Sequence, residues 1–158
     1  MIITLFFILN MVSSLHGAVF KGWCMKVTQG DSIKVYVNKK ILNIRLAYID
    51  CPELQQPFGP EALKFTSDLI LKKKVQVQIE SYSETGQLIG RVQINGEDIS
   101  MTLVQAGLAW YFKEHGKERY LLKAQRKAKR NNVGLWTQKK PVPPWIFRQE
   151  KANESGEK

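Results

Sequence analysis

The sequence predicts an α+β fold in which five short strands form a β-barrel and three helices pack against it. Two observations support this prediction. Apolar and polar residues alternate with a period of two in five segments between residues 20 and 94, which is typical of half-buried strands. A helical pattern follows the third of these segments, and two further helical patterns follow the fifth.

The first three predicted strands follow one another closely. Residues 20–28 form the first strand, and a tight turn at 29–31 leads to the second strand at 32–37. The polar segment 38–40 is typical of a hairpin turn, and the third strand runs from residue 41 to residue 48. We therefore expect the second and third strands to pair as a hairpin.

A helix is predicted between the third and fourth strands. It begins at 59–62, where Pro60 suits the first helical position and Glu61 complements the helix dipole. The fourth strand at 75–79 and the fifth at 88–94 follow. Both alternate apolar with polar residues, so each is expected to bury one face.

The chain beyond the fifth strand is predicted to be mainly helical. Helices are expected at 100–110 and, with a basic surface, at 118–131. Residues 141–145 are typical of an extended, proline-rich strap, and residues 149–158 are predicted to form a disordered tail. The order of strands and helices matches an OB-type Greek-key β-barrel, which we expect to occupy residues 19–148.

Residues 1–18 are predicted to lie outside this domain. An apolar run over residues 1–12 precedes the small pair Gly17-Ala18, as in a secretory signal peptide. The run is short for a transmembrane helix, so we expect a secreted or periplasmic protein without stable membrane association once the leader is cleaved. Because no Lys or Arg precedes the run, a membrane anchor formed by residues 1–18 is the alternative.

The chain is strongly basic, with 24 Lys and Arg against 14 Asp and Glu and a formal net charge of +10. The basic residues gather at 72–74 and between residues 117 and 140. This concentration favours attraction to a polyanion over the plainer interpretation of a well-solvated surface.

Cys24 and Cys51 are the two cysteines of the chain. Two cysteines do not make a disulfide scaffold, and their spacing does not suggest a zinc site. We expect two free or buried thiols.

Three charged residues lie close together where the third strand ends. Arg45 points away from the apolar face of the strand, and Pro52 stops the strand because it has no N–H. Asp50 and Glu53 therefore flank a break in the chain. Taken alone, this group favours a surface ion pair beside a turn over a functional site.

Asp31 adds a second carboxylate to this group. It lies in the turn between the first two strands, and the predicted hairpin places it at the same rim of the sheet as Asp50. Two carboxylates, together with water and a backbone carbonyl, are suitable ligands for Ca²⁺.

Six segments resemble those of the staphylococcal nuclease (thermonuclease) family. They are Gly30-Asp31-Ser32, Arg45 to Glu53, Gly59 to Ala62, Leu103 to Ala109, Ala124 to Ala128, and Gly134-Leu135-Trp136. The resemblance covers residues 19–148 in order and with compatible spacing, and the segment from Arg45 to Glu53 is its most specific part.

The resemblance implies a role for each matching residue. Asp31 and Asp50 match carboxylates that bind Ca²⁺, and Cys51 matches a ligand that the family uses through its backbone carbonyl. Glu53 matches the acid that orients or deprotonates the attacking water. Arg45 matches an arginine that holds the phosphate and stabilises the charge of the transition state.

One position departs from the family pattern. Aligning back from the Asn95-Gly96 turn places Gln87 where the family has a second, substrate-binding arginine. Arg91 is the alternative match, but it needs a deletion and lies about 13 Å further along the strand. We prefer Gln87, which can donate a hydrogen bond to a phosphate oxygen but carries no charge.

The resemblance implies a monomeric, Ca²⁺-dependent endonuclease that acts on single-stranded or denatured DNA and RNA and leaves 3′-phosphate ends. Because of Gln87, we expect this activity to be slow. The alternative is a catalytically impaired OB-fold module that binds nucleic acid or a protein partner. Gln87 favours this alternative, whereas the presence of Asp31, Arg45, Asp50 and Glu53 together favours the enzyme.

Overall fold

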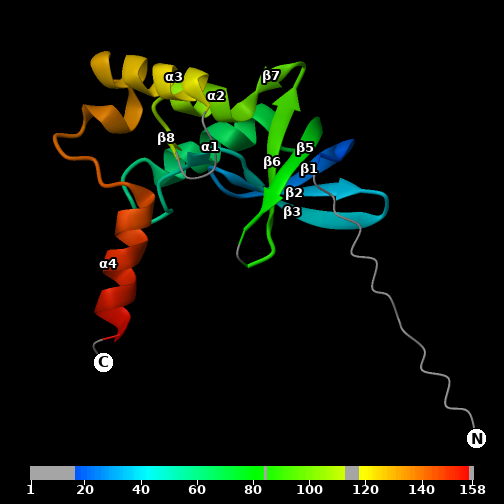
Figure 1. Ribbon diagram of the computed structural model, residues 1–158, viewed down its shortest axis with the longest axis horizontal. Helices are drawn as coiled ribbons and strands as arrows, with labels where there is room; N and C mark the ends of the chain where they lie inside the picture. The colour runs from blue at the N-terminus through cyan, green and yellow to red at the C-terminus, as the bar shows by residue number, and fades with distance from the viewer. Residues whose placement is uncertain (1–16, 84, 113–117, 157–158) are drawn as a thin grey trace, which may run out of the picture.

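A computed structural model describes residues 17–83, 85–112 and 118–156 of the chain (Figure 1). Residues 1–16, which make up most of the predicted leader, lie outside the described residues, as do the last two residues of the predicted tail. None of the described helices is both long enough and apolar enough to cross a bilayer.

Five strands form the predicted barrel. They are β1 (Val19–Gln29), β2 (Ser32–Val37), β3 (Lys40–Leu46), β5 (Lys74–Tyr82) and β6 (Leu88–Ile94). The strands pair in the order β3-β2-β1-β5-β6, and a parallel pairing of β3 with β6 closes the barrel. A short strand, β7 (Glu97–Asp98), pairs antiparallel with the last residues of β6, beyond the part of β6 that pairs with β3. The structure confirms the α+β fold and the five-stranded OB-type barrel.

The core lies inside this barrel and beneath the helices. Along β5, for example, Val75, Val77 and Ile79 are buried while the residues between them are not. This alternation is the period-two pattern on which the strand predictions rested. The two cysteines are free and buried, as predicted.

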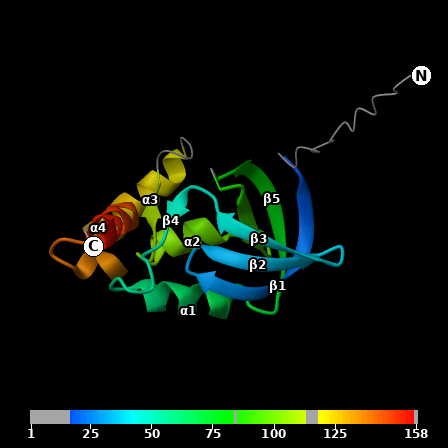
Figure 2. The ribbon, with the colours of Figure 1, turned by 90° about the horizontal axis from the view of Figure 1, so that it is seen from below.

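Three helices lie close to their predicted positions. Helix α1 (Gly59–Ile70) packs against β1 and α2 (Figure 2), and α3 (Arg119–Arg130) packs against α2 (Ile99–Gln105). A short 3-10 helix, η2 (Gly134–Thr137), follows α3. Helix α2 ends five residues earlier than predicted, because the chain turns at Gly107 with a φ of +65°.

The segment after α2 is a strand rather than the end of a helix. Strand β8 (Trp110–Tyr111) pairs antiparallel with β4 (Ile49–Asp50). The third predicted strand correspondingly ends at Leu46 and not at residue 48. This small sheet fixes the chain where the charged residues of the sequence analysis lie.

The prediction of a disordered tail was wrong for residues 149–156. They belong to a fourth helix, α4 (Pro144–Gly156), which also takes in the last two residues of the predicted strap (Figure 1). The backbone N–H groups of Ile146 and Phe147 both donate to the Pro143 carbonyl and close the first turn. The polar composition that suggested disorder instead reflects a helix whose later residues are exposed to solvent.

Candidate active site

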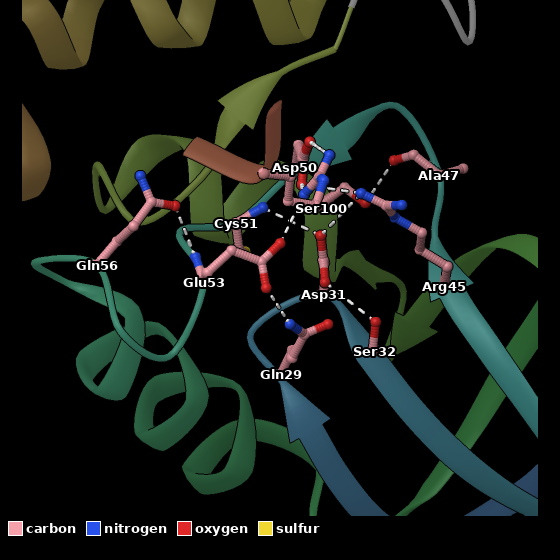
Figure 3. A network of polar contacts seen from close by, with 11 residues as sticks. Gln29, Asp31, Ser32, Arg45, Ala47, Asp50, Cys51, Glu53, Gln56 and Ser100 are labelled. Carbon is pink, nitrogen blue, oxygen red and sulfur yellow. Dashed lines mark hydrogen bonds and ion pairs between the residues drawn. The ribbon is translucent and has the colours of Figure 1, made fainter. Parts of the chain in front are cut away.

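The site forms where the β1–β2 turn meets the end of β3 and the segment that follows β4 (Figure 3). Arg45 Nη2 donates to Asp50 Oδ1 at 2.8 Å and lies 3.7 Å from Asp31 Oδ2. The backbone N–H of Cys51 donates to Asp31 Oδ2 at 3.0 Å. The structure thus brings Asp31, Arg45, Asp50 and Cys51 together.

The turn that carries Asp31 is held against α1. A Cβ at Gly30 would lie 2.7 Å from the Ala62 side chain and 2.9 Å from Cys51 Sγ, so only glycine fits this approach. The Thr66 hydroxyl donates to the Gly30 carbonyl at 2.6 Å. Helix α1 therefore sets the position of the Asp31 carboxylate.

A strained turn carries the chain from β3 to β4. Tyr48 has a φ of +66°, a conformation that side chains other than glycine rarely adopt. The Ala47 N–H donates to the Gly90 carbonyl, and its carbonyl accepts from the Ser100 hydroxyl at 3.0 Å. These bonds stabilise the reversal that faces Asp50 towards Arg45.

The two aspartates are almost completely shielded from water. The side chain of Asp31 is 4% exposed and that of Asp50 is 1% exposed. Burial raises the pKa of Asp31, and the Asp50 charge raises it further, while Arg45 opposes both effects. The buried carboxylates thus make a site in which additional positive charge is favourable.

Glu53 is positioned at the edge of this site. Its Oε2 accepts from Gln29 Nε2 at 2.6 Å, and its N–H donates to Gln56 Oε1 at 2.9 Å (Figure 3). Gln56 is buried, and its Nε2 donates to the Val142 carbonyl at 3.0 Å. The segment that contains Glu53 is therefore fixed both to β1 and to the chain that leads into α4.

Arg148 of α4 also belongs to this site, although the sequence analysis missed it. Its Nη2 donates to Asp50 Oδ2 at 2.7 Å, and its Nη1 donates to Glu53 Oε1 at 2.6 Å and to Asp50 Oδ1 at 3.2 Å. The bonds with Asp50 and Glu53 raise the pKa of the guanidinium, which stays charged. No local pattern in the sequence indicated this role, because the bonds of Arg148 join it to residues 95 and 98 positions earlier in the chain.

Gln87 lies in the β5–β6 hairpin, next to Leu88, which pairs with Ile44 of β3. Its N–H donates to the Ser83 hydroxyl, and its carbonyl accepts from the Ser83 N–H. It also lines a shallow hollow with Leu42 and Asn43. Within the described residues, no hydrogen bond joins Gln87 to the carboxylates, so its role in substrate binding remains a prediction.

Arg91, the alternative match, serves a different network. It forms ion pairs with Glu80 at 2.8 Å and with Glu118 at 2.7 Å, and it donates to the Tyr120 hydroxyl at 3.0 Å. Its guanidinium also lies 4.7 Å from the centre of the Tyr48 ring. These contacts tie β6 to β5 and to the start of α3.

The donor chemistry fits a hard cation. Burial and the neighbouring carboxylates raise the pKa of the Cys51 thiol well above its usual range, so the sulfur is neutral and packs towards Gly30. Among the described residues, no three acidic, histidine or cysteine side chains gather closely enough to hold a metal by themselves. The carboxylates of Asp31 and Asp50 with the Cys51 carbonyl and water would make the oxygen ligand set that Ca²⁺ takes.

The sequence profile described as "Staphylococcal nuclease homologue" matches residues 43–138, more than half of the chain. The chain belongs to the staphylococcal nuclease family. This family's profile spans Arg45, Asp50, Glu53 and Gln87, whereas Asp31 precedes the matched region. Arg148 follows the matched region by ten residues, so its part in the site is evident only from the structure.

Several curated proteins resemble this chain over most of its length. An "Uncharacterized endonuclease" of Escherichia coli O157:H7 is 32% identical over 88% of each chain. The "Micrococcal nuclease" of Shigella flexneri is 31% identical over 86% of this chain and 84% of its own. The "Staphylococcal-like nuclease CAN1" of Arabidopsis thaliana is 29% identical over 79% of this chain and 40% of its own.

Proposed function

We propose that this protein is a Ca²⁺-dependent endonuclease that hydrolyses phosphodiester bonds in single-stranded or denatured DNA and RNA. One observation above all supports this function. The buried carboxylates Asp31 and Asp50 lie beside Arg45 and Glu53 at one rim of the barrel. The nuclease names of the relatives and the net charge of +10 support the same substrate class.

The chain's own residues have distinct tasks in this reaction. Glu53 takes the proton of a water molecule that attacks phosphorus, while Arg45 binds a non-bridging phosphate oxygen whose charge grows in the transition state. The P–O5′ bond breaks, leaving a 3′-phosphate and a 5′-oxygen that takes its proton from water. Ca²⁺ held by Asp31, Asp50 and the Cys51 carbonyl would neutralise phosphate charge and position the water.

The protein acts, in this proposal, as an exported monomer. The apolar run and small residues of segment 1–18 support export. Mass determination of the protein recovered from its host separates a cleaved leader from a retained anchor. A species that begins at or near residue 19, outside the membrane fraction, is the expected result.

Cleavage of denatured DNA and of RNA, with Ca²⁺ and then with EGTA, tests the enzymatic proposal. We expect cleavage only with Ca²⁺, and product ends that a polymerase extends only after a phosphatase has removed the 3′-phosphate. Cleavage that persists in EGTA, or ends that are extended directly, would contradict the proposal.

A catalytically impaired OB-fold module is the second candidate function. The neutral Gln87, at the position where the resemblance calls for an arginine, supports it and also supports a slow enzyme. Binding of single-stranded DNA without any Ca²⁺-dependent cleavage would favour the module over the enzyme.

A further inference from the structure

Two arginines that are far apart in the sequence both donate hydrogen bonds to the Asp50 carboxylate. Arg45 of β3 donates to Oδ1, and Arg148 of α4 donates to both oxygens. The Asp50 side chain is 1% exposed, whereas that of Arg45 is 24% exposed and that of Arg148 is 41% exposed. The buried carboxylate thus fixes both guanidiniums, and both arginine side chains remain partly exposed to solvent.

Both guanidiniums have donors left for a ligand. A guanidinium has five N–H donors, and the three bonds of Arg148 to described residues involve only Nη1 and Nη2. Its Nε–H and one Nη2–H are therefore unused. Among the described residues, Arg45 donates from Nη2 to Asp50, so its Nη1–H donors remain for a ligand, whereas its Nε is buried. Phosphate oxygens are the acceptors that such paired donors suit best.

The start of α4 holds Arg148 in place. The Trp145 ring lies 5.8 Å from that of Trp110 and 5.2 Å from that of Phe112, centre to centre. Three residues before Trp145, the Val142 carbonyl accepts from the buried Gln56 side chain. Arg148 therefore meets the site from a segment that is anchored at two points.

We propose that Arg148 is a second catalytic arginine, which binds the scissile phosphate opposite Arg45 and stabilises its charge in the transition state. The proposal rests on the proposed nuclease function and extends its site to α4. It supplies from the C-terminal helix the positive charge that Gln87 does not carry. A residue that merely blocked Asp50 and Glu53 would have to move away before the substrate could bind. Because the segment that carries Arg148 is anchored, we assign Arg148 to substrate binding instead.

Steady-state cleavage of denatured DNA by Arg148→Gln and Arg148→Lys tests this role. We expect Arg148→Gln to lower kcat by about 10²–10³-fold, as the loss of one transition-state donor does, and Arg148→Lys to recover part of the loss. Lys151→Gln removes a charge from the exposed face of the same helix and is the matched control, with kcat unchanged within about twofold. A kcat for Arg148→Gln equal to or above that of the unsubstituted protein would overturn the proposal. It would show that Arg148 either blocks the site or forms an ion pair without effect on the rate.

Binding of a single-stranded oligonucleotide separates this proposal from the nuclease proposal. It is measured with Ca²⁺ at fixed salt in the Glu53→Gln background, in which the strand stays intact. We expect Arg148→Gln to weaken binding by more than Lys151→Gln does, whether or not the unsubstituted protein cleaves DNA. Equal affinities of the two double variants would overturn the phosphate-binding role. Absence of cleavage by the unsubstituted protein would overturn the nuclease function and the catalytic role of Arg148, and would leave only its binding of phosphate.

Discussion

Glu53 is held through both of its carboxylate oxygens, with Gln29 on one and Arg148 on the other. The substitution Glu53→Gln keeps the shape of the side chain and removes its charge and its basicity. We expect kcat to fall by about 10²–10⁴-fold, while the free energy of unfolding changes by less than about 1 kcal/mol. Parallel measurement of cleavage rate and urea unfolding checks both values, and retention of more than a tenth of the rate would exclude Glu53 as the base.

Cys24 gives the stability of the protein a defined pH dependence. Burial raises the pKa of its thiol from 9.0 to about 11. Between these values the unfolded chain loses the proton and the folded chain keeps it, so the free energy of unfolding falls as pH rises. In Cys24→Ala this fall between pH 9 and pH 11 should be smaller, by on the order of 2 kcal/mol. Urea unfolding at several pH values measures the difference, and parallel curves for the two proteins would contradict it.

The residues that the sequence analysis found are those with local signals. Asp31 and Asp50 stand at the ends of predictable strands, and the hairpin between them fixes which rim they share. Arg148 has no such signal, because the bond that defines its role joins residues 98 positions apart. Its position depends on where α4 packs against the rest of the domain. The pattern of apolar and polar residues along the sequence does not determine that packing.

The backbone at Gly107 and the backbone at Gly134 approach each other closely, where α2 ends and η2 begins. Gly107 has a φ of +65°, a Cβ there would overlap the Val133 carbonyl, and its own carbonyl accepts from Leu135 N–H. We expect Gly107→Ala to lower the free energy of unfolding by about 3 kcal/mol or more, because backbone strain and overlap add. Gly96→Ala is the control, since Gly96 has a φ of +83° and open space around it. It should cost only about 1–2 kcal/mol in the same denaturation experiment, and equal costs would exclude the overlap.

Elements of strong periodicity were predictable, and short elements were not. The alternation in β5 placed its buried residues correctly, whereas β4 and β8 have two residues each and exist only because they pair with one another. The helical interpretation of Trp110 was wrong for the same reason, since tertiary pairing outweighed local preference. Trp110 instead contacts Trp136 and Trp145, which makes it part of the anchor for α4.

At the scale of the whole molecule, the site joins the two halves of the chain. The part of the chain from the β1–β2 turn to the segment after β4 supplies three carboxylates and one arginine, and α4 adds Arg148. With Asp31, Asp50 and Glu53 ionised, two arginines leave one negative charge uncompensated. This balance favours a bound cation, and it makes the docking of α4 part of the electrostatics of the site.

Trp145 provides a test of that docking which leaves every charged group in place. Trp145→Ala removes the ring contacts with Trp110 and Phe112, so Arg148 is no longer held over Asp50. We expect kcat to fall by about tenfold or more, because the misplacement of one catalytic group by about 1 Å costs up to about 10²-fold. Ile146→Ala is the matched control, since this neighbouring side chain is 36% exposed, and its rate should be unchanged.

Combining Trp145→Ala with Arg148→Gln should lower kcat no further than Arg148→Gln alone, because both changes remove the same interaction. Losses that multiply in the double variant would show that Trp145 acts on the rate through another part of the site.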